Sequence, residues 1–197
     1  VGKLLMEQAA GTIKNMSLEL GGNAPFIVFD DADLEAAVEG AMIAKFRNNG
    51  QTCVCANRIY VQSGIYEAFA KKLKDAVCEL KVGNGFDKDV TIGPLINEAA
   101  VTKVEAHITD AVSKGAEVTT GGSRSNADST FFAPTVLKGV TRDMLVCHEE
   151  TFGPVAALVR FETEAEVIDM ANYSEFGLAS YLFSSSLSRV WRVAEAL

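Results

Sequence analysis

FRNNGQTCVC, residues 46–55, connects an apolar helix to a strand and sets a cysteine in the turn between them. Apolar side chains recur at helical spacing before this stretch, and the aspartates just ahead of them offer caps and negative charge to the start of the helix. The helix is expected to end at Asn48-Asn49-Gly50, and residues 58–61 are expected to form a short strand. The apolar face of the helix consists of Leu34, Ala37, Val38, Ala41, Met42 and Phe46.

Helical and strand patterns alternate on both sides of this stretch. A strand is predicted upstream at 13–20. Downstream, Ser63 is expected to cap a helix with a buried stripe between Ile65 and Leu80, and Thr163 to open another helix through a capping box with Glu166. The alternation predicts an α/β fold, a mostly parallel sheet covered by helices, with sites at the carboxyl ends of its strands. The remaining predicted elements are helices at 97–114 and 187–197 and strands at 116–120, 155–161 and 178–183.

Composition and charge limit the classes of protein that the chain can represent. It has 197 residues, of which 48% are hydrophobic, so it can bury a sizeable core in one domain, or in one domain with a fragment of another. The net charge is −8, the pI is about 4.8 and the 18 basic residues are scattered, so neither nucleic acid nor an anionic membrane is an expected partner. No apolar run approaches the length of a membrane span.

The four cysteines are Cys53, Cys55, Cys78 and Cys147. They are too few for a disulfide framework in a chain of this length, which favours a reducing compartment. We therefore expect a cytoplasmic protein, or one of the mitochondrial matrix if the source is eukaryotic. Cys53 and Cys55 together with Cys147-His148 do not match the ligand spacing of a zinc site, and no metal is expected.

Three residues and one segment have two interpretations each. Cys53 can be a thiolate stabilised by backbone N–H groups, or a small buried apolar residue. Glu19, just before two glycines, can be a general base beside a closely approaching ligand, or a solvated charge. Arg47 can bind an anionic group of a substrate, or form a surface ion pair. Residues 149–154, Glu-Glu-Thr-Phe-Gly-Pro, can belong to the same site, or form only a turn.

Three segments taken together resemble one family, the NAD(P)-dependent aldehyde dehydrogenases. Residues 18–22, Leu-Glu-Leu-Gly-Gly, resemble the general-base motif of that family. Residues 50–53, Gly-Gln-Thr-Cys, resemble its nucleophile motif, and residues 150–154, Glu-Thr-Phe-Gly-Pro, resemble its nicotinamide-ribose motif. The motifs have the order and spacing of the family, and the resemblance covers the whole chain. Within the family, residues 21–29 and 46–58 are most similar to the succinate-semialdehyde dehydrogenases.

The resemblance implies roles for the residues around the turn. Cys53 would attack the aldehyde carbon and carry a thioester, and Glu19 would activate the water that hydrolyses it. Arg47 would hold the far carboxylate of succinate semialdehyde, so that an anionic aldehyde is preferred to a neutral one. Cys55 suggests a further hypothesis, a reversible disulfide with Cys53, although the spacing of two residues requires the loop to rearrange first.

The cofactor implied by the resemblance is NAD or NADP, used as a cosubstrate and without a metal. Glu150 would hydrogen-bond the nicotinamide ribose, and Phe152 would pack against the cofactor. Leu20 and Gly21 would contribute to the same cofactor-binding surface. The sequence does not distinguish NAD from NADP, because the residues that read the ribose lie upstream in relatives.

The resemblance also implies how the chain is organised. Residues 1–20 would be the tail end of a dinucleotide-binding domain, and 21–197 a catalytic domain truncated at its C-terminal end. The isolated piece is then expected to be inactive, and the full-length parent to be a homodimer or homotetramer acting on a small-molecule aldehyde. Two alternatives stay open: another acyl-thioester dehydrogenase of the same superfamily, dependent on phosphate or coenzyme A, and a non-catalytic fragment.

Overall fold

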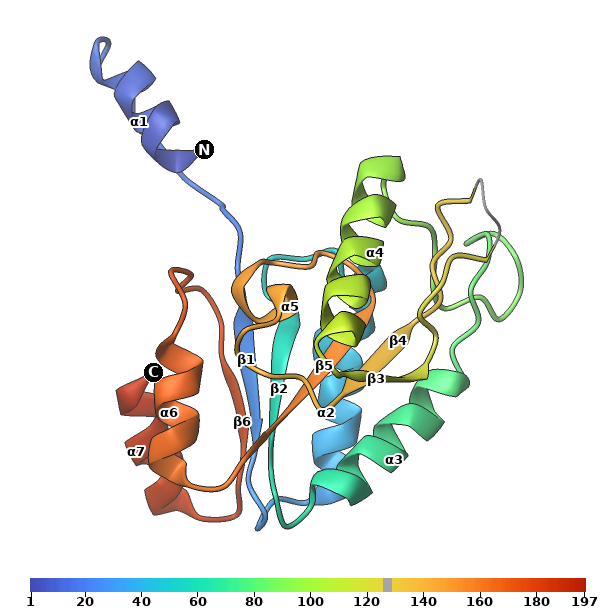
Figure 1. Cartoon of the computed structure of the whole chain (residues 1–197). Coiled ribbons are helices and arrows are strands. Elements are labelled where there is room, and N and C mark those ends of the chain that lie inside the picture. Colours follow the sequence, from blue (N-terminus) through green and yellow to red (C-terminus); the bar gives the residue numbers. More distant parts are fainter. Residues whose placement is uncertain (126–128) are drawn as a thin grey trace.

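A computed structural model describes residues 1–125 and 129–197, and Figure 1 shows the arrangement of their elements. The strands are β1 Ala24–Val28, β2 Ala56–Gln62, β3 Glu117–Thr120, β4 Thr135–Lys138, β5 Val155–Phe161 and β6 Tyr181–Phe183. The helices are α1 Gly2–Ala10, α2 Leu34–Phe46, η1 Arg47–Gly50, α3 Tyr66–Cys78, α4 Glu98–Ser113, α5 Leu145–His148, α6 Glu164–Asn172 and α7 Leu187–Ala196.

One sheet organises the described part of the chain, with the strand order β3-β4-β5-β2-β1-β6. Neighbouring strands are parallel except for β3 and β4, which are antiparallel. The prediction of an α/β fold with a mostly parallel sheet covered by helices is therefore confirmed.

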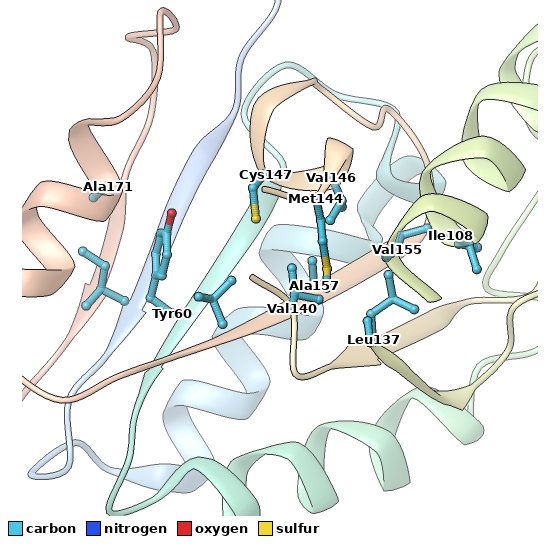
Figure 2. Close-up of a cluster of buried hydrophobic side chains, with 14 of the residues drawn as sticks. Tyr60, Ile108, Leu137, Val140, Met144, Val146, Cys147, Val155, Ala157 and Ala171 are labelled. Atoms are coloured by element: carbon cyan, nitrogen blue, oxygen red, sulfur yellow. The ribbon is translucent and has the colours of Figure 1, made fainter. Parts of the chain in front are cut away.

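Alternate side chains of the strands enter two hydrophobic clusters, one on each face of the sheet. Phe26 and Val28 of β1 belong to the cluster covered by α2 and α3, whereas Ile27 belongs to the cluster covered by α4, α5, α6 and α7. Figure 2 shows part of the second cluster, with Tyr60 and Met144 among its labelled side chains. Burial on both faces explains why the strand sequences are almost continuously apolar.

Several predicted elements are confirmed. Helix α2 occupies residues 34–46, and the side chain of Asp33 caps it by accepting a hydrogen bond from the N–H of Ala36 at 3.1 Å. Thr163 and Glu166 form both hydrogen bonds of the predicted capping box at the start of α6. Strand β5 has the predicted bounds, and α4 follows its Asn97 cap.

Two local predictions are wrong. Residues 13–20 are exposed and pair with no other strand in the described ranges, so they do not form a strand, which requires a hydrogen-bonded neighbour. Ser63 does not cap the following helix, because α3 begins at Tyr66 with Ile65 as its N-cap residue. The hydroxyl of Ser63 instead donates to the carboxylate of Glu162, in the connection after β5.

Other differences concern short or isolated elements. Strand β6 begins only at Tyr181, so residues 178–180 of the predicted strand lie outside it. Strands β1 and β4 and the single-turn helix α5 were not predicted from the sequence. Helix α1 carries no buried residue and stands away from the sheet (Figure 1), and its first residue, Gly2, lies against the side chain of Leu20.

The predicted motifs meet at the amino ends of the parallel strands, which corrects the expectation that sites gather at the carboxyl ends. Gly22 precedes β1, Cys53 precedes β2 and Glu150 precedes β5. Because β1, β2 and β5 are parallel, the three segments that lead into them lie at the same end of the strands.

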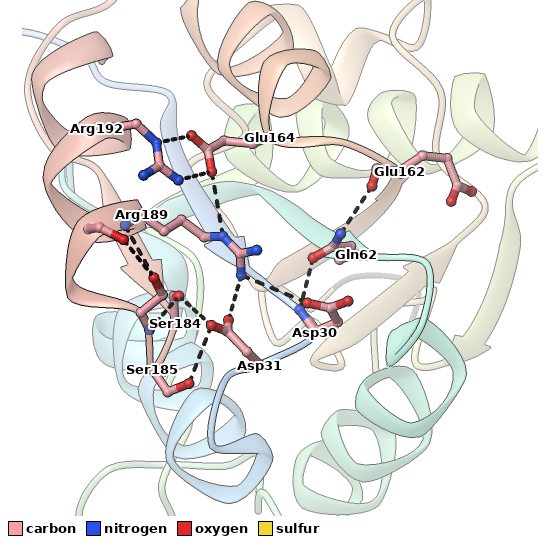
Figure 3. A network of polar contacts seen from close by, with 11 residues as sticks. Asp30, Asp31, Gln62, Glu162, Glu164, Ser184, Ser185, Arg189 and Arg192 are labelled. Atoms are coloured by element: carbon pink, nitrogen blue, oxygen red, sulfur yellow. Dashed lines mark hydrogen bonds and ion pairs between the residues drawn. The ribbon is translucent and has the colours of Figure 1, made fainter.

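The opposite, carboxyl edge is occupied by ion pairs that tie the last helices to the sheet (Figure 3). Arg189 of α7 contacts Asp31, which follows β1, at 2.8 Å, and its guanidinium also lies over the ring of Phe29. Arg192 binds both carboxylate oxygens of Glu164 in α6, at 2.8 and 2.9 Å. These bidentate and shared contacts hold α6 and α7 together at this end of the sheet.

Candidate active site

The turn that carries Cys53 is built on three consecutive residues in the left-handed region. Asn48, Asn49 and Gly50 have φ values of 51°, 58° and 74°. Asparagine and glycine tolerate this conformation better than other residues. Gly50 also has no space for a side chain, since a Cβ there would lie 2.1 Å from the carbonyl oxygen of Gly153. The Asn-Asn-Gly sequence therefore lets the cysteine turn, residues 48–55, press against the 149–154 loop.

Hydrogen bonds fix the cysteine turn from two sides. The side-chain carbonyl of Gln51 accepts from the N–H of Ile96 at 2.9 Å. On the other side, the hydroxyl of Tyr181 in β6 donates to the carbonyl of Val54 at 2.8 Å. Burial raises the pKa of Tyr181, which keeps its hydroxyl protonated as a donor. The backbone between the two cysteines of the turn is thus held by a residue 127 positions away.

The four cysteines are free thiols in different surroundings. Cys53 is partly exposed, while Cys55 is buried with its Sγ 2.7 Å from the hydroxyl of Thr52. Cys78 is exposed, and burial raises the pKa of the buried Cys147 to about 11. Cys53 therefore has access to solvent that Cys55 and Cys147 lack.

Gly22 brings three segments into contact. Its N–H donates to Oε1 of Glu150 at 2.9 Å. Its Cα packs on the cysteine turn so closely that a Cβ would lie 2.1 Å from the carbonyl oxygen of Cys53. At the preceding position, a Cβ on Gly21 would lie 2.9 Å from Oε2 of Glu150. The two glycines are needed because the backbone before β1 fits between the cysteine turn and the Glu150 carboxylate.

The 149–154 loop has a strained backbone and a buried support. Phe152 has a φ of 53°, which is unfavourable for a bulky residue, and 36% of its surface is exposed. A Cβ on the next residue, Gly153, would lie 2.4 Å from Val104 of α4. From the same helix, Nδ1 of the buried His107 lies 3.1 Å from the hydroxyl of the buried Thr151. Helix α4 therefore supports this loop from behind.

A buried lysine lies beneath the cysteine turn. Lys45 of α2 is fully buried and donates to the side-chain carbonyl of Asn57 at 3.0 Å. Asn57 in turn donates to the carbonyl of Gly22 at 3.4 Å. Burial lowers the pKa of Lys45 to about 8, and the charges of Cys55 and Glu150 oppose that shift. A cation is thus connected, through one asparagine, to the glycine that contacts Glu150.

Glu19 and Leu20 are exposed on the segment that leads into Gly21. These three residues line a groove of about 610 Å³ together with Phe176 and Leu178 from the connection before β6. The carboxylate of Glu19 has no hydrogen bond or ion pair with any described residue. The structure thus places Glu19 in a groove next to the three-segment contact, without fixing its side chain.

Arg47 is exposed just before the cysteine turn, and in the described ranges it forms no ion pair. The surface ion pair, one of its two interpretations, is therefore not formed with any residue that the structure describes. The guanidinium remains available to an anionic group from solution.

Four residues that support the site were not singled out in the sequence analysis: Lys45, Asn57, His107 and Tyr181. Two of them could have been recognised from their positions in the sequence. Lys45 follows Ala41 by four residues, and His107 follows Val104 by three, so each places a titratable group on the buried stripe of its helix. A polar residue on such a stripe needs a buried partner. Asn57 and Tyr181 gave no comparable signal, because their partners come from distant segments.

Two negative observations apply to residues 1–125 and 129–197. No cluster of three or more His, Cys, Asp or Glu side chains is arranged to bind a metal ion. None of the helices combines the length and the apolar character that crossing a bilayer requires.

The family model described as "Aldehyde dehydrogenase family" matches residues 1–197. Two relatives are each 62% identical over the whole chain: a glutarate-semialdehyde dehydrogenase of Pseudomonas aeruginosa and a 3-sulfolactaldehyde dehydrogenase of Pseudomonas putida. The chain covers 41% and 40% of those proteins, respectively. It therefore spans about two fifths of their length.

A solved structure gives a similar result. The crystal structure of a succinate-semialdehyde dehydrogenase from Burkholderia pseudomallei superposes with a TM-score of 0.97 and 63% sequence identity. The match covers all of this chain and 41% of that one. The sheet and its helices thus have the same arrangement in both.

Proposed function

Because this chain belongs to the aldehyde dehydrogenase family, we propose that it is part of an NAD(P)-dependent enzyme that oxidises an aldehyde through a cysteine thioester. The contact at Gly22 is the observation that carries the proposal, since it joins the Cys53 turn to the carboxylate of Glu150. A nucleophile and a cofactor-binding group must lie beside the same reacting carbon in such an enzyme. We assign residues 1–20 to the tail end of the dinucleotide-binding domain and 21–197 to the catalytic domain.

The proposed chemistry uses Cys53 twice. Its thiolate adds to the aldehyde carbon, a C–S bond forms, and the carbonyl electron pair moves to oxygen, where the N–H of Cys53 would stabilise it. The oxyanion electron pair returns to the C–O bond as the hydride leaves, for which a bound nicotinamide cofactor would be the acceptor, and a thioester remains on Cys53. Glu19 then takes a proton from water, the hydroxide adds to the thioester carbon, and the C–S bond breaks to release the acid and the thiolate. The exposed position of Glu19 leaves its carboxylate free to reach a water.

The residues present fit a nicotinamide cofactor, NAD or NADP, which supplies the hydride acceptor when bound. Oε1 of Glu150 is occupied by the N–H of Gly22, whereas Oε2 accepts no hydrogen bond from any described residue. One oxygen is therefore fixed and the other remains free to accept from a ribose hydroxyl. Phe152 exposes part of its ring on the same loop, and Leu20 and Gly21 would complete this surface.

The substrate is proposed to be an aldehyde with a second, anionic end, such as succinate semialdehyde. The substrates in the names of the three relatives described above all combine an aldehyde with a carboxylate or sulfonate. Arg47 is exposed, has no described ion-pair partner and lies six residues before Cys53. Its guanidinium matches the geometry of either anion.

A substitution at Arg47 tests this assignment. Arg47→Gln should raise the KM for succinate semialdehyde by at least about tenfold, the contribution of a charged hydrogen bond. It should leave the KM for butanal, a neutral aldehyde of the same length, unchanged. An equal effect on both aldehydes would contradict the assignment.

The central experiment uses the full-length parent enzyme with succinate semialdehyde and each of the two cofactors. Cys53→Ala should abolish turnover and preserve cofactor binding, whereas the matched variant Cys78→Ala, at an exposed thiol far from the site motifs in sequence, should keep full activity. Persisting turnover in Cys53→Ala would refute the proposed nucleophile. The isolated 197-residue piece should produce no NAD(P)H, and measurable production would overturn that expectation.

The two alternatives predict different results. A phosphate- or coenzyme-A-dependent relative would accumulate a long-lived thioester in the parent when its acceptor is withheld, whereas hydrolysis assisted by Glu19 would not. A non-catalytic fragment would lack an organised nucleophile. Iodoacetamide should then label Cys53 no faster than the exposed Cys78, which is a better reference than the buried Cys147.

The hypothesis of a disulfide between Cys53 and Cys55 is retained as a proposal. Both are free thiols, and the Sγ of Cys55 is buried against Thr52, so the turn must rearrange before the two sulfur atoms meet. Peroxide should inactivate the parent reversibly, with thiol restoring activity. If Cys55→Ser leaves inactivation and recovery unchanged, the hypothesis is wrong.

The assembly and location of the parent are also proposals. We expect a homodimer or homotetramer in the cytoplasm, or in the mitochondrial matrix of a eukaryote. Light scattering on the purified parent measures the first, and fractionation of the source cells measures the second.

A further inference from the structure

A histidine that the proposed reaction does not use lies behind the 149–154 loop. His107 comes from the middle of α4, and only 1% of its surface is exposed. Its Nδ1 is 3.1 Å from the hydroxyl of Thr151, and its Nε2 is 3.3 Å from Oε2 of Glu149. One imidazole therefore contacts the residues on both sides of Glu150.

The acceptor character of Glu149 fixes the direction of these hydrogen bonds. A carboxylate can only accept, so Nε2 of His107 carries the proton and donates to Glu149. Nδ1 of the neutral ring is then an acceptor, and the hydroxyl of Thr151 donates to it. Burial lowers the pKa of His107, which favours this neutral form. Both ring nitrogens are used.

The two contacts differ in how much they should matter. Thr151 is 1% exposed, so its hydroxyl has no solvent to replace a lost partner. The side chain of Glu149 is 54% exposed and can be solvated instead. The link from His107 to Thr151 is therefore the one that the loop depends on.

The loop needs support because its backbone is strained. Phe152 has a φ of 53°, a left-handed conformation that is unfavourable for an aromatic residue. Such a conformation persists only where neighbouring contacts impose it. On the side of the loop that faces the cysteine turn, the carboxylate of Glu150 accepts one hydrogen bond from a described residue, the N–H of Gly22. On the opposite side of the loop, His107 and Val104 of α4 provide the support.

We propose that His107 is a positioning residue, which holds Thr151 and Glu149 and thereby sets where Glu150 and Phe152 lie beside Cys53. The part of this inference that concerns the cofactor rests on the proposed function. The effect on the loop itself does not, because it is a property of the unliganded protein.

The test uses four variants of the full-length parent. His107→Phe removes both hydrogen bonds and keeps a ring. His107→Asn places an amide near the position of Nδ1 and can retain the contact with Thr151, whereas His107→Gln reaches toward the position of Nε2 and Glu149. Thr151→Val removes the main link from the other side, and it keeps the test available if His107→Phe does not fold.

Two measurements give the expected result. Hydrogen exchange in the peptide that contains residues 149–154 should become about tenfold faster in His107→Phe and Thr151→Val, the effect of one buried hydrogen bond left unmade. The dissociation constant for NADH or NADPH should rise by a similar factor, with a smaller change in kcat. His107→Asn should restore both properties more fully than His107→Gln.

A matched control is His148→Phe, which makes the same chemical change at the other histidine of the chain, an exposed one. It should leave loop exchange unchanged. Loop exchange at the wild-type rate in folded His107→Phe or Thr151→Val, or no advantage of Asn over Gln, would overturn the inference. A wild-type parent that binds no nicotinamide cofactor would refute the proposed function instead, while the exchange measurement would still decide the role of His107.

Discussion

The Cα of Gly22 packs against the carbonyl oxygen of Cys53, so closely that a Cβ at position 22 would lie 2.1 Å from that oxygen. The same glycine donates its N–H to Glu150. The three motifs therefore depend on one another through a residue that has no side chain.

Gly22→Ala should destabilise the protein, because the added carbon meets backbone atoms that cannot rotate away. We expect a loss of at least about 1 to 3 kcal/mol, the usual range for overpacking, measured by urea unfolding of the full-length parent. The control is Gly11→Ala, where an added Cβ meets no atom within 4 Å and the change should stay within about 0.5 kcal/mol. Equal effects of the two substitutions would contradict the close packing at Gly22.

The buried ammonium of Lys45 should make stability depend on alkaline pH. Burial lowers its pKa from 10.5 to about 8 in the folded protein, while the unfolded chain keeps the ordinary value. Between these values the unfolded state binds more protons, so the free energy of unfolding rises with pH, by about 3 kcal/mol for this group. Lys45→Met should remove that rise, which urea unfolding between pH 8 and pH 10.5 measures.

The control for this measurement is Lys103→Met, at an exposed lysine of α4. It should follow the wild-type pH dependence. Parallel pH curves for the wild type and Lys45→Met would show that Lys45 titrates normally in the folded state.

Tyr181→Phe should loosen the cysteine turn without changing its sequence. It removes the hydrogen bond to Val54, which contributes about 1 kcal/mol, or about a fivefold change in an equilibrium. Cys55 is buried, so a reagent reaches it only when the turn opens, and its labelling by iodoacetamide should accelerate by that factor. Tyr173→Phe, at an exposed tyrosine, should leave the rate unchanged. Unchanged labelling in both variants would refute the role of Tyr181.

Phe152→Gly should separate stability from function. Glycine adopts a positive φ freely, so the backbone strain at this position is relieved, while the exposed ring that we assign to the cofactor is lost. The unfolding temperature should rise or stay constant, and the KM for NAD(P) should increase several-fold. Asp89→Gly makes the same backbone change at a φ of 66° in a loop far along the chain, and it should leave the KM unaltered. A rise of the KM in both variants, or in neither, would contradict the assignment.

Much of the fold could be predicted from local pattern. The start of α2, the bounds of β5 and the capping box of α6 follow from side chains within a few residues of each other, whereas α2 ends at Phe46, before the predicted Asn48-Asn49-Gly50. The strand predicted at 13–20 failed for the complementary reason, since strand pairing depends on a partner that the local pattern cannot supply. The same dependence explains why the strand predicted at 178–183 is shorter, because only residues 181–183 pair with β1.

The sequence by itself determined the family, the order of the three motifs and the identity of the candidate nucleophile, because each rests on neighbouring residues in the chain. Only the tertiary structure decided that the motifs meet at the amino ends of the strands, with Gly22 between Cys53 and Glu150. It also revealed the supports from Lys45 and His107. The physical reason is that a buried polar group must find its partner in space, and those partners come from other elements.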